Sequence, residues 1–157
     1  MNTKPLIIIG TGSAGYTLAT FWRKIEPNQP LMIFTQDNGD FYHKPMLSTI
    51  FSKQKTLPDL VSKTAKEMAS SLNATIHTEC KVDSIYPDQK KIKTDKGEFA
   101  YEQCVIATGS VPKQIPHQCK MAYQINSLDD YKLFLPLLNT HDTVQIVGAG
   151  LIGCELT

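Results

Sequence analysis

The sequence lacks any long hydrophobic run. No apolar stretch among its 157 residues approaches the ~20 residues that a membrane-spanning helix needs. The apolar stretch that ends at Gly10 is too short for the core of a signal peptide. We therefore expect a protein with no membrane partner, and the cytoplasm is its default compartment.

Cysteine is sparse, and no cysteine stands near another. The cysteines are Cys80, Cys104, Cys119 and Cys154. Without a C-x-x-C pair or any closely spaced pair, the sequence indicates neither a zinc site nor a local redox disulfide. Cys104 lies in an apolar, strand-like run, where a buried thiol is the expected state. We expect no metal centre.

Charge of one sign is not in excess either. The formal net charge is +1 at pH 7, so bulk electrostatics give no reason to expect nucleic acid or a membrane surface as a partner. Lysines gather locally at Lys53 with Lys55, Lys63 with Lys66, and Lys90 with Lys91 and Lys93. Acidic residues interleave with the last group. A solvated surface is therefore the simpler interpretation, and a landing patch for an acidic protein is the alternative.

Residues 5–35 have the pattern of a β-α-β unit. Residues 5–9 and 31–35 are short apolar runs, typical of strands buried in a parallel sheet. Between them, apolar residues recur at intervals of three and four, which indicates the inward face of a helix that ends at Pro27. These residues are Ala14, Leu18, Trp22 and Ile25.

A glycine-rich turn, G-x-G-x-x-G, joins the first strand to the helix. Gly10 permits the tight turn, Gly12 lets the backbone approach a pyrophosphate, and Gly15 lets helix and strand pack closely. Amides at the helix start, with the positive end of its dipole, then hold the anion. An acidic residue about twenty positions further usually bonds a ribose. Here that count reaches Thr35, so either Asp37 or backbone groups take the ribose.

The middle of the chain changes period. Residues 36–58 have the composition of a loop, and residues 59–72 predict a helix. Residues 75–101 contain short runs separated by turn residues, which predict antiparallel strands. Residues 104–108 return to the buried parallel type. The pattern predicts an α/β, Rossmann-like fold: a mostly parallel sheet with helices and a small antiparallel β-meander.

The last part of the chain leads to a second glycine motif. Residues 109–118 have the composition of a connector, and Ser127 with Asp130 resembles a capping box that opens a helix. Pro136 is expected to shorten that helix. Residues 143–147 predict another buried strand. It leads into a second G-x-G-x-x-G turn, whose glycines are Gly148, Gly150 and Gly153, and a helix is expected to begin near Leu151.

Three further stretches make the pattern more specific. They are YHKPMLS (42–48), CVIATGS (104–110) and YQINSLDDY (123–131). Together with the two glycine turns, they resemble the amino-terminal region of the rubredoxin–NAD reductases. These are flavoenzymes of the pyridine nucleotide-disulfide oxidoreductase superfamily, in its branch without a redox disulfide. The resemblance covers nearly the whole chain and implies a Rossmann-like FAD/NAD(P)-binding fold.

The resemblance also implies two cofactors. Members of this family bind FAD on the first motif and NADH on the second, and a hydride passes from nicotinamide to flavin. The residues implied for FAD are Gly10, Gly12, Ser13, Ala14, Gly15, Lys44, Pro45, Thr108, Gly109 and, through its backbone at the adenine, Val82. Asp37 is added as the candidate for the ribose. The residues implied for NADH are Gly148, Gly150 and Gly153.

Two residues are implied in catalysis. The ammonium of Lys44 lies near the flavin ring and stabilises the negative charge that develops there. Glu155 reaches toward the contact of nicotinamide and flavin, and it could pair with Lys44. The alternative for Lys44 is an ordinary surface lysine. His43 is assigned no role.

The absence of C-x-x-C bears on the acceptor. Electrons must leave the flavin directly, so a disulfide reductase is disfavoured, and the resemblance favours a rubredoxin-like protein. A ferredoxin reductase component or an NADH oxidase-like flavoprotein is the alternative within the same branch. A non-catalytic nucleotide-binding module is the alternative from another class.

The resemblance further suggests that the chain is incomplete. We expect residues 1–115 to be the first segment of an FAD-binding domain, and residues 116–157 to be a crossover and the start of an NAD-binding domain. On this interpretation the second nucleotide site is incomplete. The chain alone would then bind FAD weakly or not at all and would not oxidise NADH.

Overall fold

The structure, a computed structural model, describes residues 4–50, 52–113, 122–138, 140–141 and 143–156. The chain divides into two compact units, called here the first unit (Met1–Tyr42 with Ser62–Gly109) and the second unit (His43–Val61 with Ser110–Thr157). The predicted domain boundary between residues 115 and 116 lies outside the described residues, as does Cys119. The division into domains stays a prediction.

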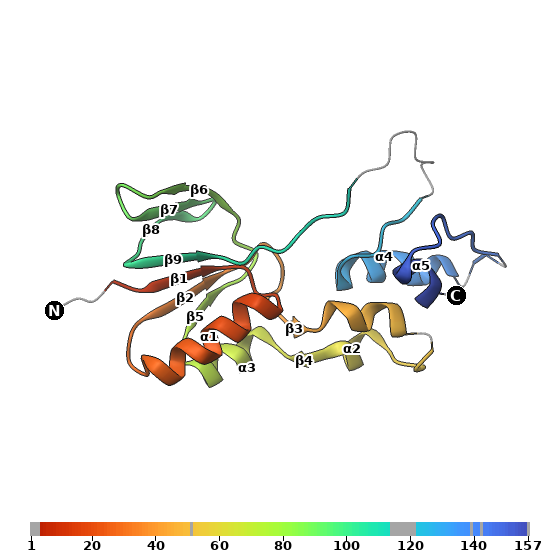
Figure 1. Cartoon of the computed structure of the whole chain (residues 1–157), viewed down its shortest axis with the longest axis horizontal. Coiled ribbons are helices and arrows are strands. Elements are labelled where there is room, and N and C mark those ends of the chain that lie inside the picture. Colours follow the sequence, from red (N-terminus) through yellow and green to blue (C-terminus); the bar gives the residue numbers. More distant parts are fainter. Residues whose placement is uncertain (1–3, 51, 114–121, 139, 142, 157) are drawn as a thin grey trace. The chain divides into compact units, whose positions relative to one another are not determined.

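A parallel sheet forms the centre of the first unit (Figure 1). Its strands, in spatial order, are β5 (Thr75–His77), β2 (Leu31–Phe34), β1 (Leu6–Ile9) and β9 (Gln103–Ile106). All residues of β1 are buried because its neighbours pair with it on both sides and both faces of the sheet are covered. The three predicted parallel strands are confirmed, and β1 and most of β2 are buried as predicted. The predicted burial of the third is wrong, because β9 lies at the edge of the sheet and has no buried residue.

Different elements cover the two faces of this sheet (Figure 1). Helices α1 (Ser13–Ile25) and α3 (Ala65–Leu72) pack on one face, where Tyr16 and Met68 join the buried core. On the other face lies an antiparallel meander that contributes Ile92 to a second buried cluster. Its strands are β6 (Val82–Tyr86), β7 (Lys91–Thr94) and β8 (Gly97–Ala100). The predicted meander is confirmed for these strands, but Thr75–His77, which was also predicted to be antiparallel, forms β5 of the parallel sheet.

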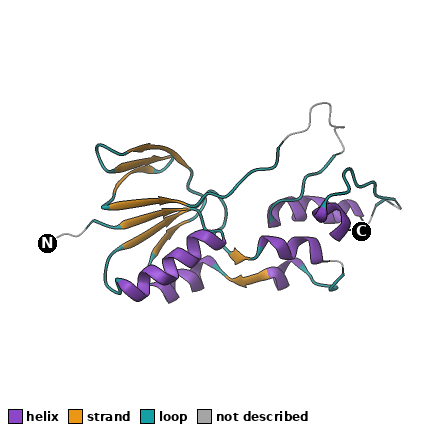
Figure 2. Cartoon of the chain, in the orientation of Figure 1, coloured by secondary structure: helices purple, strands orange, loops and turns teal. Residues whose placement is uncertain are grey.

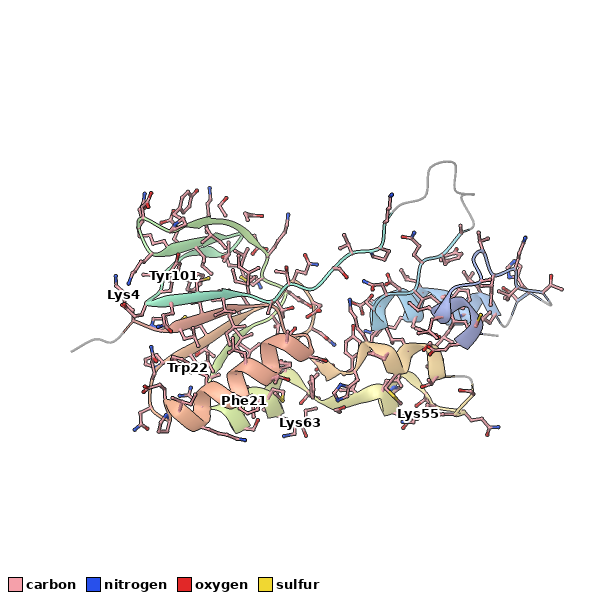
Figure 3. All side chains as sticks on the ribbon, viewed as in Figure 1. Lys4, Phe21, Trp22, Lys55, Lys63 and Tyr101 are labelled. Atoms are coloured by element: carbon pink, nitrogen blue, oxygen red, sulfur yellow. The ribbon has the colours of Figure 1, made fainter. Side chains whose placement is uncertain are left out.

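The inward face predicted for helix α1 is confirmed only in part: Leu18 and Trp22 are half-buried and pack against the core. Gly15, Tyr16 and Ala19 are its buried residues, whereas Ala14 is exposed and Ile25 is 70% exposed. The close approach of Gly15 to the glycine turn sets the rotation of the helix, so Tyr16 and Ala19 face the sheet. Figure 3 shows the neighbouring side chains of Phe21 and Trp22 on this helix.

Arg23 ties the carboxyl-terminal ends of the two covering helices together. Its Nε donates to the Leu72 carbonyl at 2.7 Å and its Nη2 to the Asn73 carbonyl at 3.0 Å, both at the end of α3. Its Nη1 donates to carbonyls in the loop after α1, at Glu26, Pro27 and Gln29. A guanidinium offers donors in a rigid fork, so one side chain satisfies several carbonyls that helix ends leave unpaired.

The single helix predicted over residues 59–72 is wrong. The segment contains α2 (Leu57–Leu60), β4 (Val61–Lys63) and α3 (Ala65–Leu72), and β4 pairs with β3 (Phe41–Tyr42). Thr64 restarts the helix with a capping box, in which its side chain accepts from the Glu67 amide and the Glu67 carboxylate accepts from the Thr64 amide. This T-x-x-E signal was present in the sequence and marks the true start of α3.

The regular secondary structure described in the second unit is mainly helical, with long loops between the helices (Figure 2). Its elements are the 3-10 helix η1 (Lys44–Thr49), α2, α4 (Leu128–Leu138) and α5 (Leu151–Glu155). The predicted cap of α4 is confirmed, since the Asp130 amide donates to the Ser127 hydroxyl at 3.1 Å. Pro136 does not shorten α4, which continues to Leu138. A proline close to the end of a helix removes only one backbone hydrogen bond there.

The strand predicted over residues 143–147 is wrong. The segment has no regular secondary structure, and Val144 and Val147 are 54% and 81% exposed. A strand needs a neighbour to satisfy its amides and carbonyls, and no strand pairs with this segment in the described part of the second unit. No helix among the described residues is long and apolar enough to cross a membrane.

Candidate functional site

The first glycine turn lies between β1 and α1, and two of its glycines are required by the chain itself. Gly10 has φ +115°, and a Cβ there would lie 2.2 Å from the carbonyl oxygen of Ala107. A Cβ on Gly15 would lie 2.0 Å from the carbonyl oxygen of Gly10. Neither position can carry a side chain without movement of the backbone. Their roles in the turn and in helix–strand packing are therefore visible in the structure.

Gly12 differs from the other two. Its φ and ψ of −69° and −179° are open to any residue. A Cβ built on Gly12 would meet no atom within 4 Å. Nothing in the described chain therefore requires glycine here. The open space beside Gly12 fits a ligand that approaches the backbone closely.

The start of α1 is open to an anion. Gly12 is the N-cap, no side chain caps the helix, and the first turn carries no acidic residue. Ser13 and Ala14, the first helical residues, are exposed. The first amides of a helix have no partner within the helix, and together with the helix dipole they favour a negatively charged group. The arrangement suits a diphosphate.

A hydrogen-bonded network organises the loop that follows β2. The Thr35 hydroxyl donates to Oδ1 of Asp37 at 2.6 Å, and the Gly39 amide donates to the same oxygen at 2.9 Å. Thr11, inside the glycine turn, lies 3.0 Å from the Thr35 hydroxyl. Asp37 is exposed, and none of these bonds uses its Oδ2. Its predicted contact with a ribose stays a prediction.

Tyr16 contacts the same loop through its hydroxyl and its ring. Its hydroxyl donates to the Gly39 carbonyl, and its ring meets Phe41 edge to face at 5.5 Å. Burial raises the pKa of Tyr16, and the nearby carboxylates of Asp37 and Asp40 raise it further. The phenol therefore stays protonated and remains a donor. Sequence reasoning missed Tyr16 because it placed this position off the inward face of the helix.

The structure brings the crossover segment to the first glycine turn. The Ala107 amide donates to the Ile9 carbonyl at 2.7 Å, and a Cβ on Gly10 would come within 3.1 Å of the Thr108 amide nitrogen. Gly109 has φ +70°, a conformation that favours glycine. Thr108 and Gly109 are exposed beside the turn. Their predicted contact with FAD is compatible with this position and stays a prediction.

Val82 lies elsewhere in the first unit. It begins β6 of the meander and packs, half-buried, against the cluster that contains Ile92. The structure gives no bond from Val82 to the glycine turn among the described residues. Its predicted contact with an adenine stays a prediction.

The second glycine turn belongs to the second unit and repeats the local geometry of the first. Gly148 has φ +112°, and a Cβ on Gly153 would lie 2.3 Å from the Gly148 carbonyl oxygen. Gly150 is the N-cap of α5, has φ and ψ of −76° and 175°, and has no atom within 4 Å of a Cβ position. The predicted start of a helix near Leu151 is confirmed.

Lys44 and Glu155 lie in the same unit but form no ion pair in the structure. Lys44 begins η1 and is exposed, with Pro45 next to it. The Glu155 carboxylate accepts a hydrogen bond from Ser48, which is 7% exposed. Ser48 was part of the YHKPMLS stretch, yet sequence reasoning gave it no role. The catalytic roles of Lys44 and Glu155 stay predictions.

Two of the three lysines in the group at residues 90–93 are paired. Lys90 lies 2.7 Å from Glu102 and Lys91 lies 3.5 Å from Glu98, and all four side chains are exposed. Such pairs contribute little to stability, and they favour the interpretation of this group as a solvated surface. Figure 3 shows Lys55 and Lys63, from the other two groups.

Cys80 and Cys104 are free thiols. Cys80 is buried, and burial raises the pKa of the Cys104 thiol. Cys154 is exposed. Among the described residues, no group of three or more histidine, cysteine, aspartate or glutamate side chains could hold a metal ion.

Relatives with curated functions match almost the whole chain. A nitric oxide reductase FlRd-NAD(+) reductase of Vibrio vulnificus is 34% identical over 155 residues, which are 97% of this chain and 41% of the relative. A rubredoxin-NAD(+) reductase of Alcanivorax borkumensis is 35% identical over 154 residues, 96% of this chain and 40% of the relative. The chain thus spans about two fifths of the length of these relatives.

Solved structures of two reductases have the same fold over almost the whole chain. An NADH:rubredoxin oxidoreductase from Clostridium acetobutylicum superposes with a TM-score of 0.82 at 24% identity, over 99% of this chain and 41% of that one. A ferredoxin reductase from Rhodopseudomonas palustris gives 0.86 at 20% identity, over 98% of this chain and 39% of that one. These likenesses confirm the predicted α/β, FAD/NAD(P)-binding fold.

The family match agrees with the resemblance inferred from the glycine turns and the YHKPMLS stretch. The sequence pattern of the family described as pyridine nucleotide-disulphide oxidoreductase matches residues 4–157. The chain belongs to the pyridine nucleotide-disulphide oxidoreductase family.

Proposed function

We propose that this chain carries the FAD-binding turn and part of the NADH site of a flavin-dependent oxidoreductase. The enzyme passes electrons from NADH through the flavin to a small redox protein of rubredoxin type. Family membership and the names of the relatives support this class of reaction. The chain's own geometry supports the assignment of the first turn to a dinucleotide.

One observation carries the proposal: glycine at position 12 has no steric cause within the described chain. Its dihedral angles are ordinary and no atom lies within 4 Å of a Cβ position. Serine, aspartate or asparagine would cap α1 better than glycine does. A ligand that must reach the backbone amides explains why the better caps are not used. The same argument holds for Gly150 in the second turn.

The proposed work of the first unit is to bind and orient. The amides of Ser13 and Ala14 hold the diphosphate at the positive end of α1. Thr108 and Gly109 border the same space, since the crossover backbone lies against Gly10. Asp37 keeps its Oδ2 for a ribose hydroxyl while its Oδ1 fixes the loop.

The proposed work of the second unit is to act on the reacting groups. When bound, FAD supplies the capacity to accept a hydride from NADH and to release electrons singly. Lys44 places a positive charge beside the ring and stabilises the negative charge that develops there. Pro45 lies against the ring and limits access of water. Gly150 and the start of α5 hold the diphosphate of NADH, and Glu155 faces the nicotinamide.

The first test asks whether the protein that carries residues 1–157 contains flavin. The proposal expects a yellow protein that releases FAD on denaturation and is bleached by NADH without oxygen. The Gly12→Asp variant should lose FAD, because a carboxylate fills the space of the diphosphate and repels it. The matched Gly150→Asp variant should keep FAD and lose bleaching by NADH. A colourless protein that binds adenine nucleotides tightly would instead indicate a non-catalytic module.

A second test identifies the acceptor. After bleaching by NADH, the protein is mixed with a rubredoxin, with a ferredoxin or with dissolved oxygen, and the return of the yellow colour is timed. The proposal expects the rubredoxin to restore the colour fastest. If the ferredoxin or oxygen restored the yellow colour fastest, that acceptor would replace the rubredoxin in the proposal.

A further inference from the structure

The 3-10 helix η1 and the short helix α5 lie against each other in the second unit. They are far apart in the sequence, since η1 ends at Thr49 and α5 begins at Leu151. The side chain that joins them is Ser48, whose hydroxyl donates to the Glu155 carboxylate. The bond connects the segment that carries Lys44 to the helix that begins at the second glycine turn.

Ser48 is well placed to hold that carboxylate. It is 7% exposed, and its neighbours Leu47 and Ile50 are 5% and 2% exposed. These buried residues fix the orientation of η1, so the hydroxyl cannot swing away into water. Glu155 itself is exposed, and a hydrogen bond to an ionised group is stronger than one between neutral groups.

The hydroxyl has a second potential acceptor, the Pro45 carbonyl at 3.0 Å. A serine hydroxyl has one proton and donates fully to one acceptor at a time. Among the described residues, the neighbouring Thr49 hydroxyl has only the local contact, to the Met46 carbonyl at 3.0 Å. The contact with Glu155 therefore distinguishes Ser48 from Thr49 and cannot be explained as the ordinary local bond of a 3-10 turn.

We propose that Ser48 is a positioning residue, whose hydroxyl holds the Glu155 carboxylate against the helix that carries Lys44 and Pro45. The inference rests on the proposed function, in which Lys44 lies at the flavin and Glu155 faces the nicotinamide. Ser48 touches neither cofactor. It acts through Glu155 and keeps the flavin-side and nicotinamide-side residues in one arrangement.

The test compares Ser48→Ala with the matched control Thr49→Ala, in the protein that carries this chain. Ser48→Ala should keep its FAD and slow the reduction of flavin by NADH about tenfold, the effect of one lost bond to a charged group. Ser48→Thr keeps a hydroxyl and should restore most of the rate. Thr49→Ala should match the unaltered protein. A Ser48→Ala protein with the full rate would overturn the inference.

A double-mutant cycle shows whether Ser48 acts through Glu155. If it does, Ser48→Ala should slow flavin reduction no further once Glu155→Ala is present. Slowing by the same factor in both backgrounds would mean that Ser48 works by another route, which would also overturn the inference.

A readout without cofactor separates this inference from the proposed function. In urea unfolding of the chain without added flavin or NADH, the effects of Ser48→Ala and Glu155→Ala should be less than additive. Additive effects would show that the two side chains do not interact. If the unaltered protein contains no flavin, the proposed function fails, while the unfolding cycle still decides whether Ser48 holds Glu155.

Discussion

The two glycine turns of this chain have nearly the same shape in very different surroundings. Gly10 and Gly148 have φ of +115° and +112°. In each turn a Cβ on the last glycine would strike the carbonyl oxygen of the first, at 2.0 Å for Gly15 and 2.3 Å for Gly153. The shape of the turn is thus a local property of the G-x-G-x-x-G pattern.

The surroundings differ on both sides of the turn. The first turn follows β1, which is buried in the centre of a sheet, and the Ala107 backbone lies against Gly10. The second follows residues 143–147, which are exposed and form no strand, and no atom lies within 4 Å of a Cβ position on Gly148. The turn can therefore form from its own residues, whereas the strand before it needs neighbouring strands to pair with.

The largest expected difference between the turns is at the last glycine. Gly15→Ala should destabilise the chain by about 3 kcal/mol, because the new methyl overlaps a backbone oxygen that the sheet holds in place. Gly153→Ala should cost less than about 1 kcal/mol, because the exposed turn can open and alanine favours a helix. Urea unfolding followed by circular dichroism measures both. Equal losses would mean that the surroundings do not stiffen the first turn.

The next difference is at the first glycine. Both Gly10→Ala and Gly148→Ala force a side chain into a conformation that favours glycine, which costs about 1 kcal/mol. Gly10→Ala adds overlap with the Ala107 carbonyl, for a total of about 2 to 3 kcal/mol. The same unfolding measurement applies. A Gly148→Ala variant as damaged as Gly10→Ala would show that the second turn has close neighbours in solution.

The contrast between the turns also explains what could be predicted from the sequence. Short apolar runs between turn residues identified β1 and β2, because a strand that is covered on both faces of a sheet is apolar at successive positions. The same argument failed for residues 143–147, since whether an apolar run becomes a strand depends on a partner that the run itself does not encode. Periodicity likewise failed to show that Val61–Lys63 pairs with Phe41–Tyr42 and interrupts a helix.

The candidate site was predictable to the extent that it is local. The glycine spacing identified both turns and both helix starts, because the backbone demands at Gly10 and Gly15 are set within a few residues. The bond from Ser48 to Glu155 joins residues 107 positions apart. The Tyr16 hydroxyl donates to the carbonyl of Gly39, 23 positions away. No spacing rule connects such pairs, and only the folded chain shows them.

A smaller effect is expected at the middle glycines, where stability and binding should move in opposite directions. An aspartate at position 12 would cap α1 and add a negative charge at its positive end, so Gly12→Asp should stabilise the chain by about 0.5 to 1 kcal/mol. It should also abolish FAD binding, for the reason given above. Urea unfolding of the chain measures the gain in stability, and calorimetric titration with FAD of the protein that carries the chain measures the loss of binding. A destabilised Gly12→Asp chain would mean that the space beside Gly12 is filled in solution.

The Gly150→Asp variant makes the same change at the second turn and can be compared directly with Gly12→Asp. Its gain in stability should be smaller, since α5 (Leu151–Glu155) is a short helix. FAD binding should be unchanged. If Gly150→Asp also removed FAD, the two turns would not serve separate nucleotides.

The smallest effect is a dependence on pH that should affect the first unit only. His77, on β5, stacks on Phe34 at 4.5 Å, and its buried Nε2 has no hydrogen-bond partner among the described residues. Burial, and then the charge of Lys96, lower the pKa of His77. The unfolded chain binds a proton near pH ~6.5, before the folded chain does, so the chain loses stability as the pH falls through that value.

Urea midpoints at about pH 7.5 and about pH 5.5 bracket the unfolded pKa of histidine and measure this loss. His77→Phe keeps an aromatic ring on Phe34 and removes the titrating group, so its midpoint should fall less between the two values than that of the unaltered chain. His141, exposed in the second unit, provides the control, and His141→Gln should leave the original dependence in place. The prediction would be wrong if His77→Phe kept the full dependence of the midpoint on pH and His141→Gln removed it. The acid-sensitive contact would then lie in the second unit, and a neutral His77 would not stabilise the first unit.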